Sequence, residues 1–124
     1  METKQGLTDL LATAAAEGLL VDAAGVAIAS ASALPYGVVL RSDDPSGYST
    51  VALPGYNGII EMKCHSTAGT IAKGTLLVTH SSGGVVKADP ATGARVVVGR
   101  AVEAGANSAL VKAIFFSSPI IYTS

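Results

Sequence analysis

The chain has 124 residues, which is enough for one domain with a hydrophobic core of its own. Charged residues make up 14% of it, against about 25% in typical soluble domains, so other chains are expected to cover part of its surface. The net charge is −1 and the basic residues are scattered, which argues against direct nucleic-acid binding. No apolar run is long enough to cross a membrane, and the single cysteine, Cys64, has no partner for an internal disulfide.

The N-terminal segment differs in composition from the rest and predicts a division of the chain after residue 24. Residues 1–24 are expected to form an arm or short helix, and residues 25–124 a β-rich domain. A helix is expected because the apolar positions follow helical spacing, at Leu7, Leu10, Leu11, Ala14 and Ala15. Such a helix is too short to be stable alone, so it must dock on its own domain or on a neighbouring chain. The mixed charges at the start are not those of a signal peptide, which predicts a cytosolic, reduced protein.

Three strands separated by turns are expected between residues 26 and 63. They cover residues 26–32, 38–41 and 59–63, and the last two each follow an Ala-Leu-Pro turn. We interpret these as two similar turns rather than as an internal repeat. Residues 42–47 are rich in Ser, Asp and Gly, which is typical of a polar surface loop.

The second half carries the clearest β pattern. Strands are predicted at residues 75–79 and 85–88, joined by a tight turn into a hairpin. A β-branched strand follows at 95–102, where Gly99 is expected to mark a bulge or a close backbone approach. The last strand is predicted at 109–116, with Pro119 ending the pairing before an apolar tail. Short strands at this spacing favour a small β-barrel or β-sandwich.

No residue set in the sequence predicts catalysis, cofactor binding or metal binding. Cys64 and His65 are adjacent, and adjacent strand residues point to opposite faces, so they are poorly placed to act as a nucleophile and its base. One cysteine and two histidines are too few for a zinc site. Asp43 and Asp44 are better explained by a solvated turn than by a calcium site. The expectation is a protein that is not an enzyme and needs no cofactor.

The second half resembles a known family in four short segments. They are residues 68–77 (AGTIAKGTLL), 84–88 (GVVKA), 97–105 (VVGRAVEAG) and 110–113 (LVKA). In this order they resemble the capsid cement, or decoration, proteins of tailed bacteriophages. There a strand entry with Lys-Gly-x-Leu precedes a Gly-x-Val return, a Val-x-Gly-x-Ala strand and a final apolar strand. The resemblance covers roughly residues 68–116.

The resemblance implies a small β-rich, β-tulip-like domain that usually trimerises. Such trimers sit on the exterior of an icosahedral shell at three-fold and quasi-three-fold points, and clamp major capsid subunits after the shell expands. The implied partners are the major capsid protein and further copies of the chain, and the implied location is the virion surface after synthesis in the host cytoplasm. From the apolar character of the two ends, the candidate interface residues are Leu7, Leu10, Leu11, Ile120, Ile121 and Tyr122. The alternative that each set packs on its own domain stays open.

The rival interpretation is a biotinyl- or lipoyl-carrier-like barrel. Met62-Lys63 is similar to the Met-Lys turn that bears the swinging cofactor in those domains. Against it, the next residue is Cys64 rather than Met, and the pair lies in a strand-like run rather than at a hairpin tip. A third option, a small enzyme with its site between subunits, requires a polar cluster that the sequence does not offer.

Overall fold

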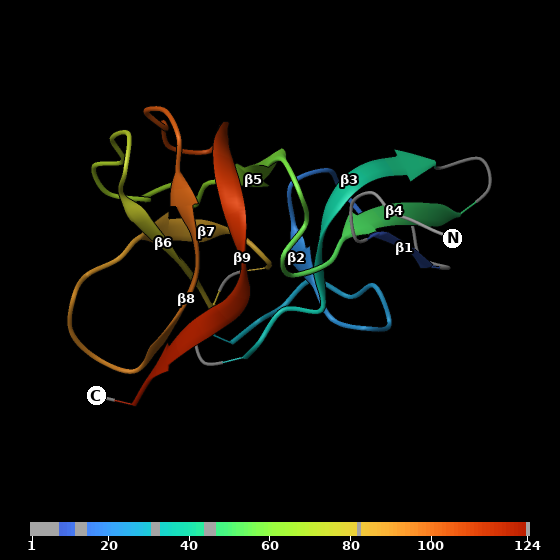
Figure 1. Cartoon of the computed structure of the whole chain (residues 1–124), viewed down its shortest axis with the longest axis horizontal. Coiled ribbons are helices and arrows are strands. Elements are labelled where there is room, and N and C mark those ends of the chain that lie inside the picture. Colours follow the sequence, from blue (N-terminus) through green and yellow to red (C-terminus); the bar gives the residue numbers. More distant parts are fainter. Residues whose placement is uncertain (1–7, 12–14, 31–32, 44–46, 82, 124) are drawn as a thin grey trace.

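The computed structural model describes residues 8–11, 15–30, 33–43, 47–81 and 83–123. These residues form a mainly β protein with two antiparallel sheets and, within those ranges, no helix. The two sheets lie side by side in Figure 1 and share a core, as expected for a small sandwich or barrel-like fold.

The first sheet has four strands in the order β1-β4-β3-β2. Their bounds are β1 (Thr8–Leu11), β2 (Leu20–Val21), β3 (Gly37–Asp43) and β4 (Tyr48–Ala52). β1 and β2 precede residue 25 and are hydrogen-bonded to β4 and β3 respectively. This part of the N-terminal segment is therefore paired within the sheet.

The predicted N-terminal helix is wrong where the structure describes the segment. Leu10 pairs with Thr50 and Leu11 with Ser49 in β1, so the backbone bonds to a neighbouring strand instead of to its own next turn. Strand geometry sends adjacent side chains to opposite faces, whereas a helix would have placed both leucines on one face. Leu7 and Ala14 lie outside the described residues.

The second sheet has five strands in the order β5-β9-β8-β6-β7. Their bounds are β5 (Ile59–Lys63), β6 (Leu76–Thr79), β7 (Val86–Ala88), β8 (Arg95–Ala101) and β9 (Leu110–Tyr122). The strands predicted in the second half are confirmed, and β6 and β7 form the predicted hairpin. In the first half, the described part of the strand expected at 26–32, residues 26–30, forms one isolated bridge at Ala27, while β4 was not predicted.

The bulge expected at Gly99 is present, and it explains why β9 continues past Pro119. Along the β8–β9 ladder Val97 pairs with Ile120 and Gly99 with Phe115, so four residues of β9 bulge out opposite a single residue of β8. Pro119 lies within that bulge, where a missing N–H removes no ladder bond. The expectation that Pro119 ends the pairing is therefore wrong.

The main core fills the space between the sheets. It combines apolar side chains of the first sheet, such as Leu20 and Val38, with those of the second, such as Met62, Leu77 and Phe115. A second, smaller cluster lies on the other face of the first sheet and consists of Leu11, Val21, Val39 and Val51. The first sheet is thus apolar on both faces, which fits its run of β-branched residues.

Two glycines join the sheets through backbone hydrogen bonds. Gly18 donates its N–H to the carbonyl of Val39 in β3 at 2.8 Å, and its carbonyl accepts from the N–H of Lys63 in β5 at 2.9 Å. Gly84, in the β6–β7 turn, accepts from the N–H of Leu20 at 2.8 Å and has φ of +78°. A Cβ at Gly84 would lie 2.5 Å from the Leu20 carbonyl oxygen, so no side chain fits there.

Gly84→Ala is expected to destabilise the protein more than Gly83→Ala. Both glycines have positive φ in the same turn, so each substitution carries a left-handed penalty of about 1–2 kcal/mol. A Cβ at Gly83 meets nothing within 4 Å, whereas one at Gly84 collides with the backbone of β2. Urea unfolding should give a loss of more than about 3 kcal/mol for Gly84→Ala. Equal losses for the two variants would show that this junction between the sheets does not matter.

Candidate interaction surface

The reactive side chains singled out in the sequence are held in structural roles. Cys64 is buried, and burial raises the pKa of its thiol, which disfavours the nucleophilic thiolate. The rings of His65 and His80 are stacked with centroids 3.9 Å apart. His65 Nδ1 accepts the N–H of Thr67 at 3.0 Å, so the ring fixes the following turn. The pKa of His80 is lowered by burial, then by the nearby His65 and Lys87.

The described residues offer no built site for an ion. Among them, no three His, Cys, Asp or Glu side chains lie together in a way that suits a metal. Asp43 is the last residue of β3, and Asp44 falls outside the described ranges. Within those ranges there is no helix that is both long and apolar enough to span a bilayer.

The candidate interface residues at the N-terminal end divide between core and surface. Leu11 is 8% exposed and packs in the smaller cluster, while Leu10 is 60% exposed on the other side of β1. Leu7 lies outside the described residues. Of the three leucines, only Leu10 is therefore placed by the structure at the surface.

All three candidates at the C-terminal end are exposed. Ile121 is 54% exposed, and Ile120 and Tyr122 are also on the surface. They form the last residues of β9 and pair with Val96, Val97 and Arg95 of β8. Figure 1 places this end of β9 far from β1, at opposite ends of the molecule, so the structure does not bring the two candidate sets together.

Arg95 fixes the end of β9 in place. Its Nε donates to Asp89 Oδ1 and its Nη1 to the carbonyl of Gly93 at 2.9 Å. The Arg95 guanidinium also lies over the Tyr122 ring, 4.0 Å from its centroid. The ion pair is largely buried, with side-chain exposures of 9% for Arg95 and 14% for Asp89. These contacts of Arg95 therefore hold in place the end of β9, which carries the exposed apolar side chains.

Arg95→Met is expected to lower the free energy of unfolding by about 2–3 kcal/mol, because Asp89 would lose its charged partner. Hydrogen exchange should also quicken at Ile120 to Tyr122. Arg100→Met is the matched control, since Arg100 is exposed and makes one long bond, of 3.3 Å, to the Gly74 carbonyl. Equal stability losses in the two variants would contradict the anchoring role.

Asp9 of β1 is hydrogen-bonded to Tyr36, and we call this contact the Asp9–Tyr36 clamp. The Tyr36 hydroxyl donates to Asp9 Oδ2 at 2.5 Å, and Asp9 Oδ1 accepts the N–H of Leu10 at 2.8 Å. The Tyr36 hydrogen bond, followed by that of Leu10, lowers the pKa of Asp9, and the same contact with Asp9 raises the pKa of Tyr36. The clamp thus holds β1 against the turn before β3.

Tyr36→Phe is expected to raise the Asp9 pKa toward its ordinary value. Because the pKa of Asp9 is lower in the folded state, ionised Asp9 stabilises the fold at pH values above its ordinary pKa. This stabilisation is lost as the pH falls through the pKa that Asp9 has in the folded protein. NMR titration of the Asp9 carboxyl measures the shift. Tyr56→Phe should leave it unchanged, and an unmoved Asp9 pKa in Tyr36→Phe would refute the clamp.

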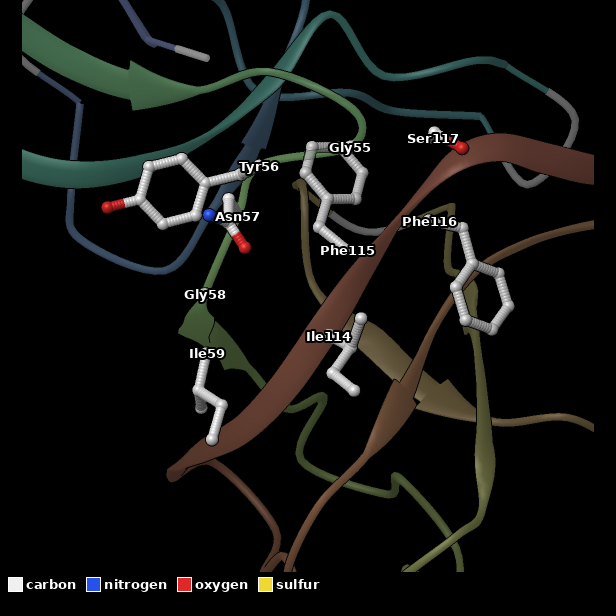
Figure 2. Close-up of a pocket in the computed structure, with 9 residues that line it drawn as sticks. All are labelled: Gly55, Tyr56, Asn57, Gly58, Ile59, Ile114, Phe115, Phe116 and Ser117. Atoms are coloured by element: carbon white, nitrogen blue, oxygen red, sulfur yellow. The ribbon is translucent and has the colours of Figure 1, made fainter. Parts of the chain in front are cut away.

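A shallow groove that the sequence did not predict lies between the start of β5 and the bulged part of β9. It has a volume of about 720 Å³. Figure 2 shows Tyr56 and Asn57 on its β5 side, Phe116 and Ser117 on β9, and Ile59 and Ile114 on the two strands near its lower end. The sequence signal that could have indicated this groove is the apolar run Ile114 to Phe116 in β9. Successive strand residues face opposite sides, so this run places apolar groups on both faces.

Comparison of the chain with protein-family models, with curated proteins and with solved structures found no match. The function therefore has to be inferred from the surface of the molecule itself. That surface offers exposed apolar side chains, such as Leu10 and Ile121, on hydrogen-bonded strands. Such an arrangement is suited to binding other proteins.

Proposed function

We propose that the protein is a capsid decoration protein, which binds the outer surface of an expanded phage head and stabilises it. The observation that carries the proposal is the placement of exposed apolar side chains at two opposite ends of one folded unit. Leu10 lies at one end and Ile120, Ile121 and Tyr122 at the other. A rigid unit with two apolar ends is able to contact two neighbouring shell subunits at once. The resemblance in residues 68–116 supplies the shell as the target.

The strength of such a clamp comes from repetition. Burying one Leu or Ile side chain contributes about 1.5–3 kcal/mol, so a few exposed residues give a modest contact each. Two contacts made by one rigid unit act together, because the second forms at high effective concentration. Each bound copy then favours the assembled shell over its dissociated subunits by mass action.

The proposal includes the trimer that the resemblance implies. Cyclic symmetry would close the contacts among three copies at a three-fold point of the shell. The low charge of the chain, 14% of its residues, supports burial of surface between chains. The partners are thus the major capsid protein and two further copies.

The carrier interpretation is less well supported by the geometry around Lys63. A swinging cofactor needs its lysine at an exposed hairpin tip, whereas Lys63 ends β5, pairs with Leu110 of β9 and is half-buried. The backbone N–H of Lys63 also donates a hydrogen bond to the carbonyl of Gly18. Mass spectrometry that found biotin or lipoate on Lys63 would reverse this preference.

Mixing the purified protein with expanded, undecorated shells tests the proposal. Binding and a higher temperature of shell disruption are expected. Leu10→Ser and Ile121→Ser should each weaken binding by about tenfold or more, since each removes an apolar side chain from the contact. Val26→Ser is the matched control, because Val26 is 58% exposed but belongs to neither of the two groups of apolar residues proposed to contact the shell.

Two results would contradict the proposal. One is a folded protein that neither binds the shells nor raises their resistance to heat. The other is binding that Val26→Ser weakens as much as Leu10→Ser and Ile121→Ser, which would mean that the two end sets are not the contact.

A further inference from the structure

The outward-facing side of β5 and β9 carries a regular two-strand pattern that the function above does not use. Ile60 and Met62 of β5 and Val111 and Ala113 of β9 point into the core, so their neighbours face outward. We call this side the β5–β9 outer face. Its cross-strand pairs are Ile59 with Ile114, Glu61 with Lys112, and Lys63 with Leu110.

The β5–β9 outer face exposes apolar groups that the described residues leave uncovered. Ile59 is 60% exposed, Ile114 is 43% exposed and Leu110 is 38% exposed. Figure 2 shows Ile59 and Ile114 on the adjoining strands β5 and β9. Large exposed aliphatic side chains gathered on one sheet face are typical of a contact surface.

Two exposed residues of opposite charge lie beside each other at the centre of this face. Glu61 lies on β5, and Glu17 lines a small groove beside it. Lys112 lies on β9, and Arg100 of β8 pairs with Ile114 and therefore shares the same face. Glu61 and Lys112 are both exposed, and no ion pair joins them within the chain. Lys63, half-buried at the end of β5, is a further basic residue on this face. At the centre of the face, exposed Glu61 of β5 lies directly beside exposed Lys112 of β9.

The central Glu61–Lys112 pair makes the face complementary to itself in one orientation. A two-fold axis lying in the contact plane, parallel to the strands, exchanges β5 of one copy with β9 of the other. Glu61 then lies opposite Lys112 of the second copy, twice, and Ile59 lies opposite Ile114. An in-plane axis perpendicular to the strands would instead set Glu61 against Glu61, which is repulsive.

We propose that two copies of this chain associate face to face through the β5–β9 outer face, about that strand-parallel two-fold axis. The contact is isologous, so each favourable pair occurs twice. It involves six outward residues per copy, whereas a standard interface has about 20–30 a side, and the association is accordingly weak and concentration-dependent. Because its charged pairs are exposed, it weakens as salt rises.

Sedimentation equilibrium over a wide concentration range, at low salt, tests this contact with the chain alone and no shell. A monomer–dimer equilibrium is expected. Glu61→Lys and Lys112→Glu should each lower the association constant by about tenfold or more, because each reversal turns two attractive pairs into repulsive ones. The double variant carrying both changes restores the pairs with exchanged signs, and its association constant should return to within about threefold of the original.

Charge-matched controls separate the contact from a general effect of net charge. Glu103→Lys and Lys73→Glu alter exposed residues in turns outside the β5–β9 outer face, and should leave the dimer unchanged. The proposal is overturned if the protein stays monomeric at millimolar concentration, or if it forms trimers that both reversals leave intact. It is also overturned if the controls weaken association equally, or if the folded double variant fails to recover it. Because no shell is present, none of these outcomes tests shell binding, although trimers that both reversals leave intact would support the trimer of the proposed function.

Discussion

The fold depends on the backbone hydrogen bonds by which one segment, residues 18–28, joins the two sheets. Gly18 bonds to β3 on one side and to β5 on the other, and Gly84 ties the β6–β7 turn to Leu20 and to Ile28. Both junctions need a backbone without a side chain, because a Cβ at Gly18 would meet Leu110 and one at Gly84 would meet Leu20. With the junctions made, the apolar faces of both sheets are held over one core.

This arrangement explains why the second half of the chain was predictable and the first half was not. The strands of the second sheet combine β-branched residues with alternation and glycine turns, which are local signals. The segment before residue 25 is Ala- and Leu-rich, and its helical spacing is a local signal too. In the structure, β1 and β2 of this segment instead pair with β4 and β3. These strands supply backbone partners that no local pattern reveals. Pro119 was wrongly expected to end the pairing for a related reason. Only the pairing of β9 with β8 shows that this proline lies within a bulge.

The candidate contact residues also needed the structure to place them. The sequence left open whether Ile120, Ile121 and Tyr122 pack on their own domain, and the structure places them exposed at the end of β9. The separation of Leu10 from Leu11 was not foreseeable, because a helix places both on one face and a strand separates them. The pairing of Ile59 with Ile114, like the stacking of His65 on His80, joins residues far apart in sequence, and only the fold brings them together.

The order of strands in the second sheet has a consequence for synthesis of the chain. β9 is made after all the other described strands of its sheet, yet it lies between β5 and β8 and pairs with both of them. Until residues 110–122 have left the ribosome, β5 and β8 lack the strand that pairs with both of them, and the main core lacks Val111, Ala113 and Phe115. Unpaired edges and uncovered apolar faces are what attract other chains. The nascent protein is therefore most open to misassembly just before β9 emerges, and this one strand then closes the sheet.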